Sequence, residues 1–112
     1  MSESMCGEEF MEKLTRDFAE MIARRVTDEI VVYDYDVLPD TLIDNCDFYS
    51  KLIDILEEEH DIMLLVTDVG NYFIKKKDYE YFSSVSEDDA EDLDDKKRRA
   101  WKIVDRYNSY HY

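Results

Sequence analysis

Residues 62 to 76 read IMLLVTDVGNYFIKK, in which two apolar runs enclose a short polar segment. Ile62 to Val66 and Tyr72 to Lys76 are rich in the branched and aromatic residues that favour strands. Between these runs, Gly70 and Asn71 both tolerate the positive φ that a tight turn needs. The segment therefore predicts an antiparallel hairpin, and we interpret the rest of the chain around it.

A further strand is expected before the hairpin, from Ile30 to Tyr35, where branched and aromatic residues again follow one another. Alternate side chains of a strand point to opposite faces, so Tyr33 and Tyr35 would share one face. Asp34 and Asp36 would lie on the other face, which we expect to be exposed to water at that end. After the hairpin, alternating residues fit a continuation of the last strand or the start of another: Tyr79, Tyr81 and Val85.

Two amphipathic helices are predicted near the ends of the chain, from 8 to 26 and from about 87 to 108. In the first, oppositely charged (i, i+4) pairs such as Glu12 with Arg16 give a balanced solvent face. Before the second, Ser86 and Asp89 resemble a capping box. Its acidic residues precede its basic ones, which suits the helix dipole. Both helices are therefore expected to have ordinary solvated faces.

A middle helix is predicted from about 39 to 61, and Pro39 suits its first position. A break near 45 to 47 is compatible with the pattern, because Asp47 is able to cap a second helical segment. The apolar residues that recur at helical spacing are its predicted core positions: Leu42, Cys46, Tyr49, Ile53 and Leu56.

These elements predict an α+β fold, with a small and mainly antiparallel sheet covered by three helices in the order α-β-α-β-β-α. A chain of 112 residues with 45% hydrophobic and 13% aromatic residues is long and apolar enough to form one core. We therefore expect a single folded domain over residues 1 to 112, although the net charge of −15 by itself favours disorder.

Most of this charge lies between Asp28 and Asp61, where twelve acidic residues less one basic residue, Lys51, give a net charge of −11. Six of these acids follow at steps of three and four when Lys51 is counted as the missing member: Asp40, Asp44, Asp47, Asp54, Glu58 and Asp61. On a helix this spacing predicts a single stripe on the solvent side. Like charges so placed oppose helix formation by roughly 0.2–0.5 kcal/mol per pair, which suggests a purpose other than local stability.

A binding surface is one explanation of the charge, and a face that only keeps the protein soluble is the other. Carboxylates on a helix stripe rise by about 4.5–6 Å, comparable with phosphates along a nucleic-acid strand, and tyrosines, Tyr72 among them, would add aromatic contacts. The predicted partner-binding residues are Asp34, Asp36, Asp40, Asp44, Asp47, Asp54, Glu57, Glu58, Asp61, Tyr33, Tyr35 and Tyr49. A basic protein is the expected partner, because this charge repels nucleic acid and anionic lipid.

Catalysis, cofactors and bound metal ions are not expected. Only His60 and His111 belong to the residue type that ordinarily exchanges a proton near neutral pH, and the chain has no glycine-rich phosphate loop. Cys46 is expected to be a small core residue and not a nucleophile. Glu57 and His60 have the spacing of a di-metal helix, but such a site needs the motif twice.

A reducing, cytoplasmic compartment is expected from two cysteines in a chain without a secretory signal. No apolar run reaches the roughly 18 residues that a membrane span requires, so no membrane contact is expected. Lys75 to Lys77 is the only cationic run that is not embedded in acids. Direct binding of nucleic acid is therefore not expected.

At the level of composition and plan, the Asp40 to Asp61 stripe, the Asp34 and Asp36 pair and the short single domain resemble the small acidic DNA mimics of mobile elements, the anti-CRISPR and anti-restriction inhibitors. The resemblance implies a non-enzymatic phage inhibitor whose carboxylates occupy the basic groove of a host nuclease or effector complex. Two alternatives remain open. One is an immunity protein or antitoxin that neutralises a basic toxin, and the other is an acidic protein–protein adaptor or homodimer.

Overall fold

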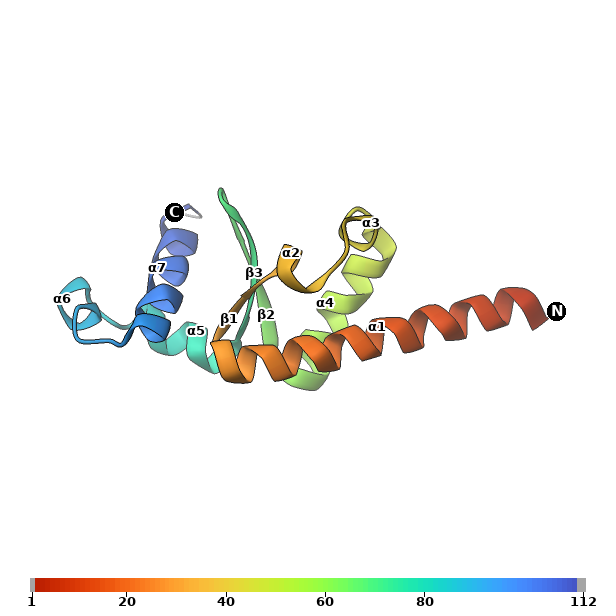
Figure 1. The fold of residues 1–112 in the computed structure, drawn as a ribbon, viewed down its shortest axis with the longest axis horizontal. Helices are drawn as coiled ribbons and strands as arrows, with labels where there is room; N and C mark the ends of the chain where they lie inside the picture. The colour runs from red at the N-terminus through yellow and green to blue at the C-terminus, as the bar shows by residue number, and fades with distance from the viewer. Residues whose placement is uncertain (1, 111–112) are drawn as a thin grey trace.

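The computed structural model describes residues 2 to 110, with side chains from Glu9 onward. A three-stranded antiparallel sheet with the order β1-β3-β2 lies between groups of helices (Figure 1). Its strands are β1 (Val31–Tyr33), β2 (Ile62–Thr67) and β3 (Gly70–Lys75). The prediction of a mixed helix and strand fold with a small antiparallel sheet is confirmed. The predicted number of helices is wrong, because the described residues form seven helical segments instead of three.

The predicted hairpin joins β2 to β3, and its turn consists of Asp68 and Val69. Gly70 has a φ of 143°, a conformation that residues with a side chain rarely adopt, which confirms its predicted role. Asn71, in contrast, lies within β3 and not in the turn. A Cβ at position 70 would stand 2.3 Å from Cε1 of Tyr33, so the absence of a side chain lets the Tyr33 ring lie against the turn.

The two faces of the sheet bury separate cores, because alternate strand residues point to opposite sides. One face packs against α1 (Ser2–Glu29) and α4 (Cys46–His60), and the other against α5 (Lys76–Ser83) and α7 (Asp95–Tyr110). The buried strand residues of the first face include Val32, Ile62 and Phe73, and those of the second include Val31, Leu65 and Ile74. The sheet is thus a middle layer between two helical layers.

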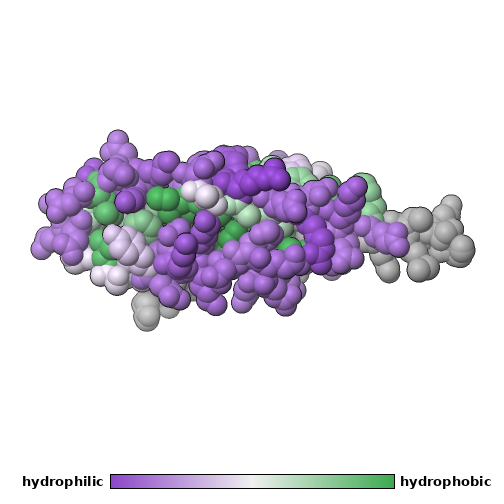
Figure 2. Space-filling view, turned by 90° about the horizontal axis from the view of Figure 1, so that it is seen from below, coloured by the Kyte–Doolittle hydropathy of each residue, from purple (hydrophilic) through white to green (hydrophobic). Residues whose placement is uncertain are grey.

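The first helix is confirmed and is longer than predicted, and its N-terminal part extends beyond the other elements (Figure 1). Arg16 pairs with Glu12 on the same helix and with Glu59 on α4. Near the other end, Nζ of Lys96 donates to the carbonyl of Asp28 at 2.7 Å and satisfies one of the last helix carbonyls. The face on which α1 lies is mainly hydrophilic, with apolar side chains between the polar ones (Figure 2).

The first strand is shorter than predicted, because the chain forms a helical segment, α2 (Asp34–Val37), directly after Tyr33. The backbone N of Leu38 donates to the carbonyl of Asp34 at 2.9 Å and closes this turn. The alternation expected for Asp34 and Tyr35 therefore does not apply, and Asp34 is completely buried instead of facing water. Strand preference is a weak signal that tertiary packing overrides here.

The middle helix is divided into α3 (Asp40–Ile43) and α4, so the break that the sequence allowed is present. Asn45 and not Asp47 caps α4, because its Oδ1 accepts a hydrogen bond from the backbone N of Phe48 at 3.1 Å. The cap restarts the helical phase, and the buried residues of α4 are Phe48, Leu52, Ile55 and Leu56. Cys46 is exposed at the start of α4, so its predicted place in the core is wrong.

The segment after β3 is helical, so the strand considered at Tyr79, Tyr81 and Val85 is wrong. The hydroxyl of Tyr79 donates to Oδ1 of Asn108 at 2.7 Å and ties α5 to α7. The helical conformation of α5 thus places this hydroxyl within hydrogen-bonding distance of α7.

The predicted last helix is also divided, into α6 (Glu87–Ala90) and α7. Ser86 caps α6 as predicted, since its Oγ accepts a hydrogen bond from the backbone N of Asp89 at 3.2 Å. At the start of α7, Oδ1 of Asp94 accepts from the backbone N of Lys97 at 2.9 Å. This second cap separates the two helices.

Candidate partner-binding surface

The predicted acidic stripe is not continuous, because α3 and α4 have separate axes and phases on either side of the Asn45 cap. Asp47, Asp54 and Glu58 keep their spacing around Lys51 on the exposed side of α4, and we call these three acids the α4 stripe. Asp40 and Asp44 lie on or beside α3 instead. Asp61 follows α4 in a left-handed conformation with a φ of 56°, so it is outside the stripe.

Three tyrosines come together where β1 passes into α2, and we call them the tyrosine cluster: Tyr33, Tyr35 and Tyr72. The register of β1 and β3 pairs Tyr33 with Tyr72, and their ring centroids are 5.2 Å apart at an interplanar angle of 38°. The rings of Tyr33 and Tyr35 have centroids 5.5 Å apart at 39°. Tyr35 is 52% exposed, whereas Tyr33 and Tyr72 are half-buried. The cluster therefore presents one aromatic ring to solvent on top of two supporting rings.

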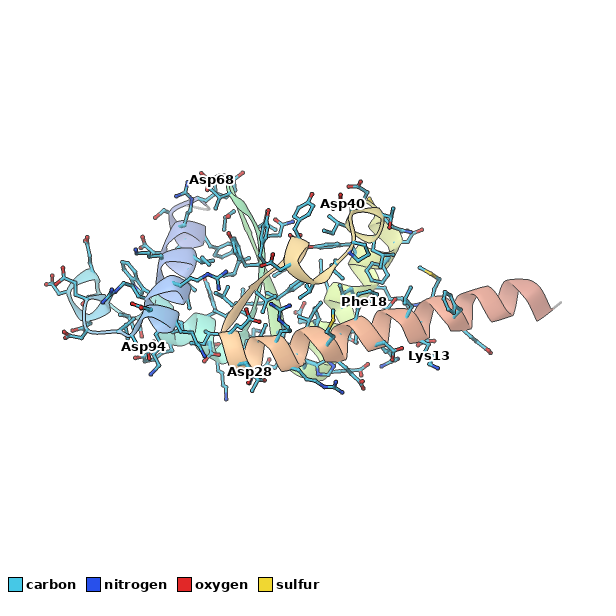
Figure 3. All side chains as sticks on the ribbon, in the orientation of Figure 1. Lys13, Phe18, Asp28, Asp40, Asp68 and Asp94 are labelled. Carbon is cyan, nitrogen blue, oxygen red and sulfur yellow. The ribbon has the colours of Figure 1, made fainter. Side chains whose placement is uncertain are left out.

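Carboxylates surround this cluster, and we call Asp36, Asp40 and Asp44 the acidic rim. All three side chains are exposed. The pKa of the Tyr35 hydroxyl is raised, first by partial desolvation and then by the negative charges of Asp34, Asp44 and Asp40. The rim and the tyrosine cluster thus form one electrostatic environment. Asp40 lies at the same edge of the molecule as the hairpin turn with Asp68, away from Asp28 (Figure 3).

Asp34 does not belong to the exposed surface, which corrects its predicted role as a partner contact. Its exposed fraction is 0%, and the hydroxyl of Tyr49 donates to its Oδ2 at 2.9 Å. The other carboxylate oxygen, Oδ1, is buried without a hydrogen-bond partner among the described residues. Burial, followed by the hydrogen bond to Asp34, raises the pKa of Tyr49. The ring of Tyr49 stacks on Phe73 with a centroid distance of 6.4 Å, so this tyrosine supports the surface from inside.

Glu57 and Asp61 are exposed, but they lie beside the start of β2 and not beside the tyrosine cluster. With Ile53, Met63 and Lys76 among others, they line a shallow cavity of about 260 Å³. His60 and Asp61 line a second cavity with Lys75 and Lys77. Between Glu9 and Tyr110, no group of three His, Cys, Asp or Glu side chains is placed to hold a metal ion. The structure thus divides the surface residues of the predicted site into three groups: the α4 stripe, the acidic rim with the tyrosine cluster, and the pair of Glu57 and Asp61.

The rim and the α4 stripe carry negative charge without direct ion pairs among residues 9 to 110, and Asp36 of the rim acts electrostatically on the nearby Arg25. Within the described part of the chain, none of their six carboxylates makes an ion pair, whereas Glu29, Glu59 and Asp68 pair with arginines. Two arginines of α7 donate to backbone carbonyls and form no ion pair with these six carboxylates. Arg98 donates to the carbonyls of Glu91 and Leu93, and Arg99 to that of Val31.

A second acidic group, which sequence reasoning assigned to a solvated helix face, surrounds α6. The exposed acids there are Glu87, Asp88, Asp89, Glu91 and Asp92. They lie far from α3 along the long axis of the molecule and directly before the basic start of α7 (Figure 1). The tyrosine cluster is not among their neighbours, because its rings contact one another at β1, α2 and β3, so these acids provide an internal control for the effect of charge.

Two features of the surface were missed by sequence reasoning. The structural role of Asp34 had no local signal, because it depends on the helical turn of α2 and on Tyr49, fifteen residues away. The role of Gly70 in making room for Tyr33 had a partial signal, since a glycine was expected in the turn but its contact was not.

No helix among residues 2 to 110 is both long and apolar enough to cross a lipid bilayer. A comparison with protein-family models, known proteins and solved structures found no match to this chain. Function is therefore argued from the chemistry of the surface alone.

Proposed function

We propose that the protein is a non-enzymatic acidic inhibitor that binds the basic nucleic-acid-binding groove of a host nuclease or effector complex, as a mimic of DNA. The observation that carries this proposal is a set of six exposed carboxylates without ion pairs in the described chain, three in the acidic rim beside the exposed Tyr35 and three in the α4 stripe. Carboxylates without internal partners are available for the lysine and arginine side chains that otherwise hold phosphates.

The spacing of the α4 stripe supports a phosphate-like arrangement. Asp47, Lys51, Asp54 and Glu58 follow at steps of four, three and four residues, which correspond to rises of about 4.5–6 Å along the helix. The rim continues the negative charge beyond the Asn45 cap in a different direction. A basic groove would therefore meet acids on two short elements that the Asn45 cap separates, and Lys51 interrupts the acids within α4.

Tyrosines beside acids are also what an immunity protein or antitoxin would use against a basic toxin. The specific observation that favours this second candidate is the 52% exposure of Tyr35, because aromatic side chains are common anchors of tight interfaces. The two candidates differ in the partner's occupied surface. A mimic competes with nucleic acid, whereas an immunity protein covers one active site and an adaptor does neither.

The test is a pull-down from host lysate at low and high salt, followed by competition with duplex DNA for each captured protein. We expect nucleic-acid-binding proteins that are released by salt, since exposed charge pairs are screened within about 8–10 Å at physiological ionic strength. DNA should displace the tagged protein from them. Capture that resists high salt, or that DNA does not disturb, would remove the mimic and favour the toxin or adaptor alternatives.

A further inference from the structure

We infer that the tyrosine cluster and the acidic rim recognise arginine side chains of the basic partner in preference to lysine. This inference rests on the proposed function, and it names the residue type that the rim and cluster bind. The α4 stripe has no such preference, because no aromatic ring accompanies it among the described residues.

The ring geometry is the first reason. The neighbouring rings of the cluster are tilted by 39° and 38° relative to each other. The rings of Tyr79 and Tyr107, in contrast, meet edge to face at 84°. The outermost ring, Tyr35, is 52% exposed and so has a surface on which a planar group can stack. A guanidinium is planar and weakly hydrated and stacks on aromatic faces, whereas an ammonium is a compact and strongly hydrated point charge.

The carboxylates beside the rings are the second reason. Asp40 and Asp44 are exposed, make no ion pair within the described chain, and act on the hydroxyl of Tyr35. A guanidinium stacked on Tyr35 therefore has carboxylate oxygens within its own electrostatic reach. Its five N–H donors form a fixed planar fork that makes two parallel hydrogen bonds to a carboxylate, a geometry that the tetrahedral donors of an ammonium do not match.

Buried Asp34 is the third reason. Its Oδ1 is buried with no hydrogen-bond partner among the described residues, and the carboxylate is close enough to act electrostatically on both Tyr35 and Tyr72. Neither nearby arginine forms an ion pair with Asp34, because Arg25 pairs with Glu29 and Arg99 donates to the carbonyl of Val31. A carboxylate without an ion pair near the rings adds to the attraction of a cation that stacks on Tyr35, against the opposing charge of Arg99 near Tyr72.

Oligo-arginine and oligo-lysine peptides of equal length are suitable probes, because they match in charge and differ in the group that carries it. Dissociation constants would be measured by calorimetry at one low ionic strength for the full chain. We expect the arginine peptide to bind about five- to tenfold more tightly, a difference within the range that one partly desolvated cation–π contact provides. In Tyr35→Leu this ratio should fall toward two, while Tyr35→Phe, which keeps the ring, should retain it.

A variant of the α4 stripe, Asp54→Asn with Glu58→Gln, serves as the matched control. It should weaken the binding of both peptides by the same factor and leave their ratio unchanged. Equal binding of the two peptides to the unaltered protein, or the same ratio in Tyr35→Leu, would overturn the inference while leaving the proposed function intact. If neither peptide binds in a salt-dependent manner, the proposed function is wrong and the inference falls with it.

Discussion

Replacing Tyr49 by Phe tests whether Asp34 is a structural residue and not a partner contact. The substitution removes the hydroxyl that donates to Oδ2 of Asp34 at 2.9 Å. Oδ1 of Asp34 already has no partner among the described residues. In the variant, neither oxygen of this buried carboxylate would accept a hydrogen bond from a described side chain. We expect the free energy of unfolding to fall.

The size of this effect follows from the charge of the acceptor. A hydrogen bond to a charged group contributes about 1.5–3 kcal/mol, and leaving the charge buried without a donor makes the upper part of that range the better expectation. For a chain of 112 residues, unfolding entropies of globular proteins imply a change of about 4 °C in melting temperature per kcal/mol. Tyr49→Phe should therefore melt about 8–12 °C lower than the unaltered protein.

Asp34→Asn is the matched control, because the amide oxygen still accepts from Tyr49 while the buried charge is removed. Its melting temperature should be equal or higher, and affinity for a basic partner should change much less than in the acidic rim variants. Thermal unfolding followed by circular dichroism gives both values. A loss of under about 0.5 kcal/mol in Tyr49→Phe, within the range of ordinary surface substitutions, would show that Asp34 is open to water and that its predicted place in the binding surface was right.

Three further perturbations follow from the same structure. Gly70→Ala should lower the free energy of unfolding by about 1–3 kcal/mol, because a residue with a side chain is strained at a φ of 143°. The loss, measured by urea unfolding, should be smaller in a Tyr33→Ala background, where the clash with the ring is absent. Equal losses in the two backgrounds would contradict the contact between position 70 and Tyr33. Replacing four acids of the rim and α4 stripe by Asn or Gln should abolish partner binding and leave the free energy of unfolding unchanged or slightly higher. Replacing four acids around α6 in the same way should cost little affinity. Equal losses of affinity in the two variants would show that binding depends on total charge. The first set is Asp40, Asp44, Asp54 and Glu58, and the control set is Glu87, Asp88, Glu91 and Asp92. The pKa of Tyr49 is raised in the folded state, so folding favours its protonated form. Its contribution to stability is therefore complete below a pH of about 10 and is lost as pH rises above that value. Tyr49→Phe should flatten the resulting fall of melting temperature with alkaline pH, and an unchanged slope would contradict the burial of the Tyr49 hydroxyl beside Asp34.

The elements that could be predicted from the sequence are those with strong local signals. The hairpin has two apolar runs around a glycine, and the first helix has apolar residues at every third or fourth position, and both are present. The capping signals were also informative, because Ser86 caps α6 as expected. Where the cap residue was wrongly chosen, at Asp47 instead of Asn45, the helical phase shifted and Cys46 moved from the predicted core to the surface.

The parts that could not be predicted depend on contacts between distant residues. The strand predicted from Ile30 to Tyr35 ends at Tyr33, which pairs with Tyr72 across the sheet, and Asp34 begins a helical turn in which its carboxylate accepts from Tyr49. Periodicity also assigned six acids to one stripe, since it has no means of detecting that a cap divides the helix. The charge of the surface was thus predictable from the sequence, whereas its division into a rim and a stripe was not.

The position of the charge within α4 bears on whether it serves only solubility. The C-terminal half of the helix contains Asp54, Glu57, Glu58 and Glu59, and the only basic residue in its last turn is His60. Acids in the last turn of a helix oppose its dipole, at a cost of about 0.3–1 kcal/mol each, and this applies to Glu57, Glu58 and Glu59. Of these three only Glu59 has an ion pair among the described residues. A soluble surface needs acids, but it does not need them where they destabilise the helix that carries them. Because natural sequences depart from local stability rules at functional sites, the acids in the C-terminal half of α4 support the proposal that this part of the helix binds a basic partner.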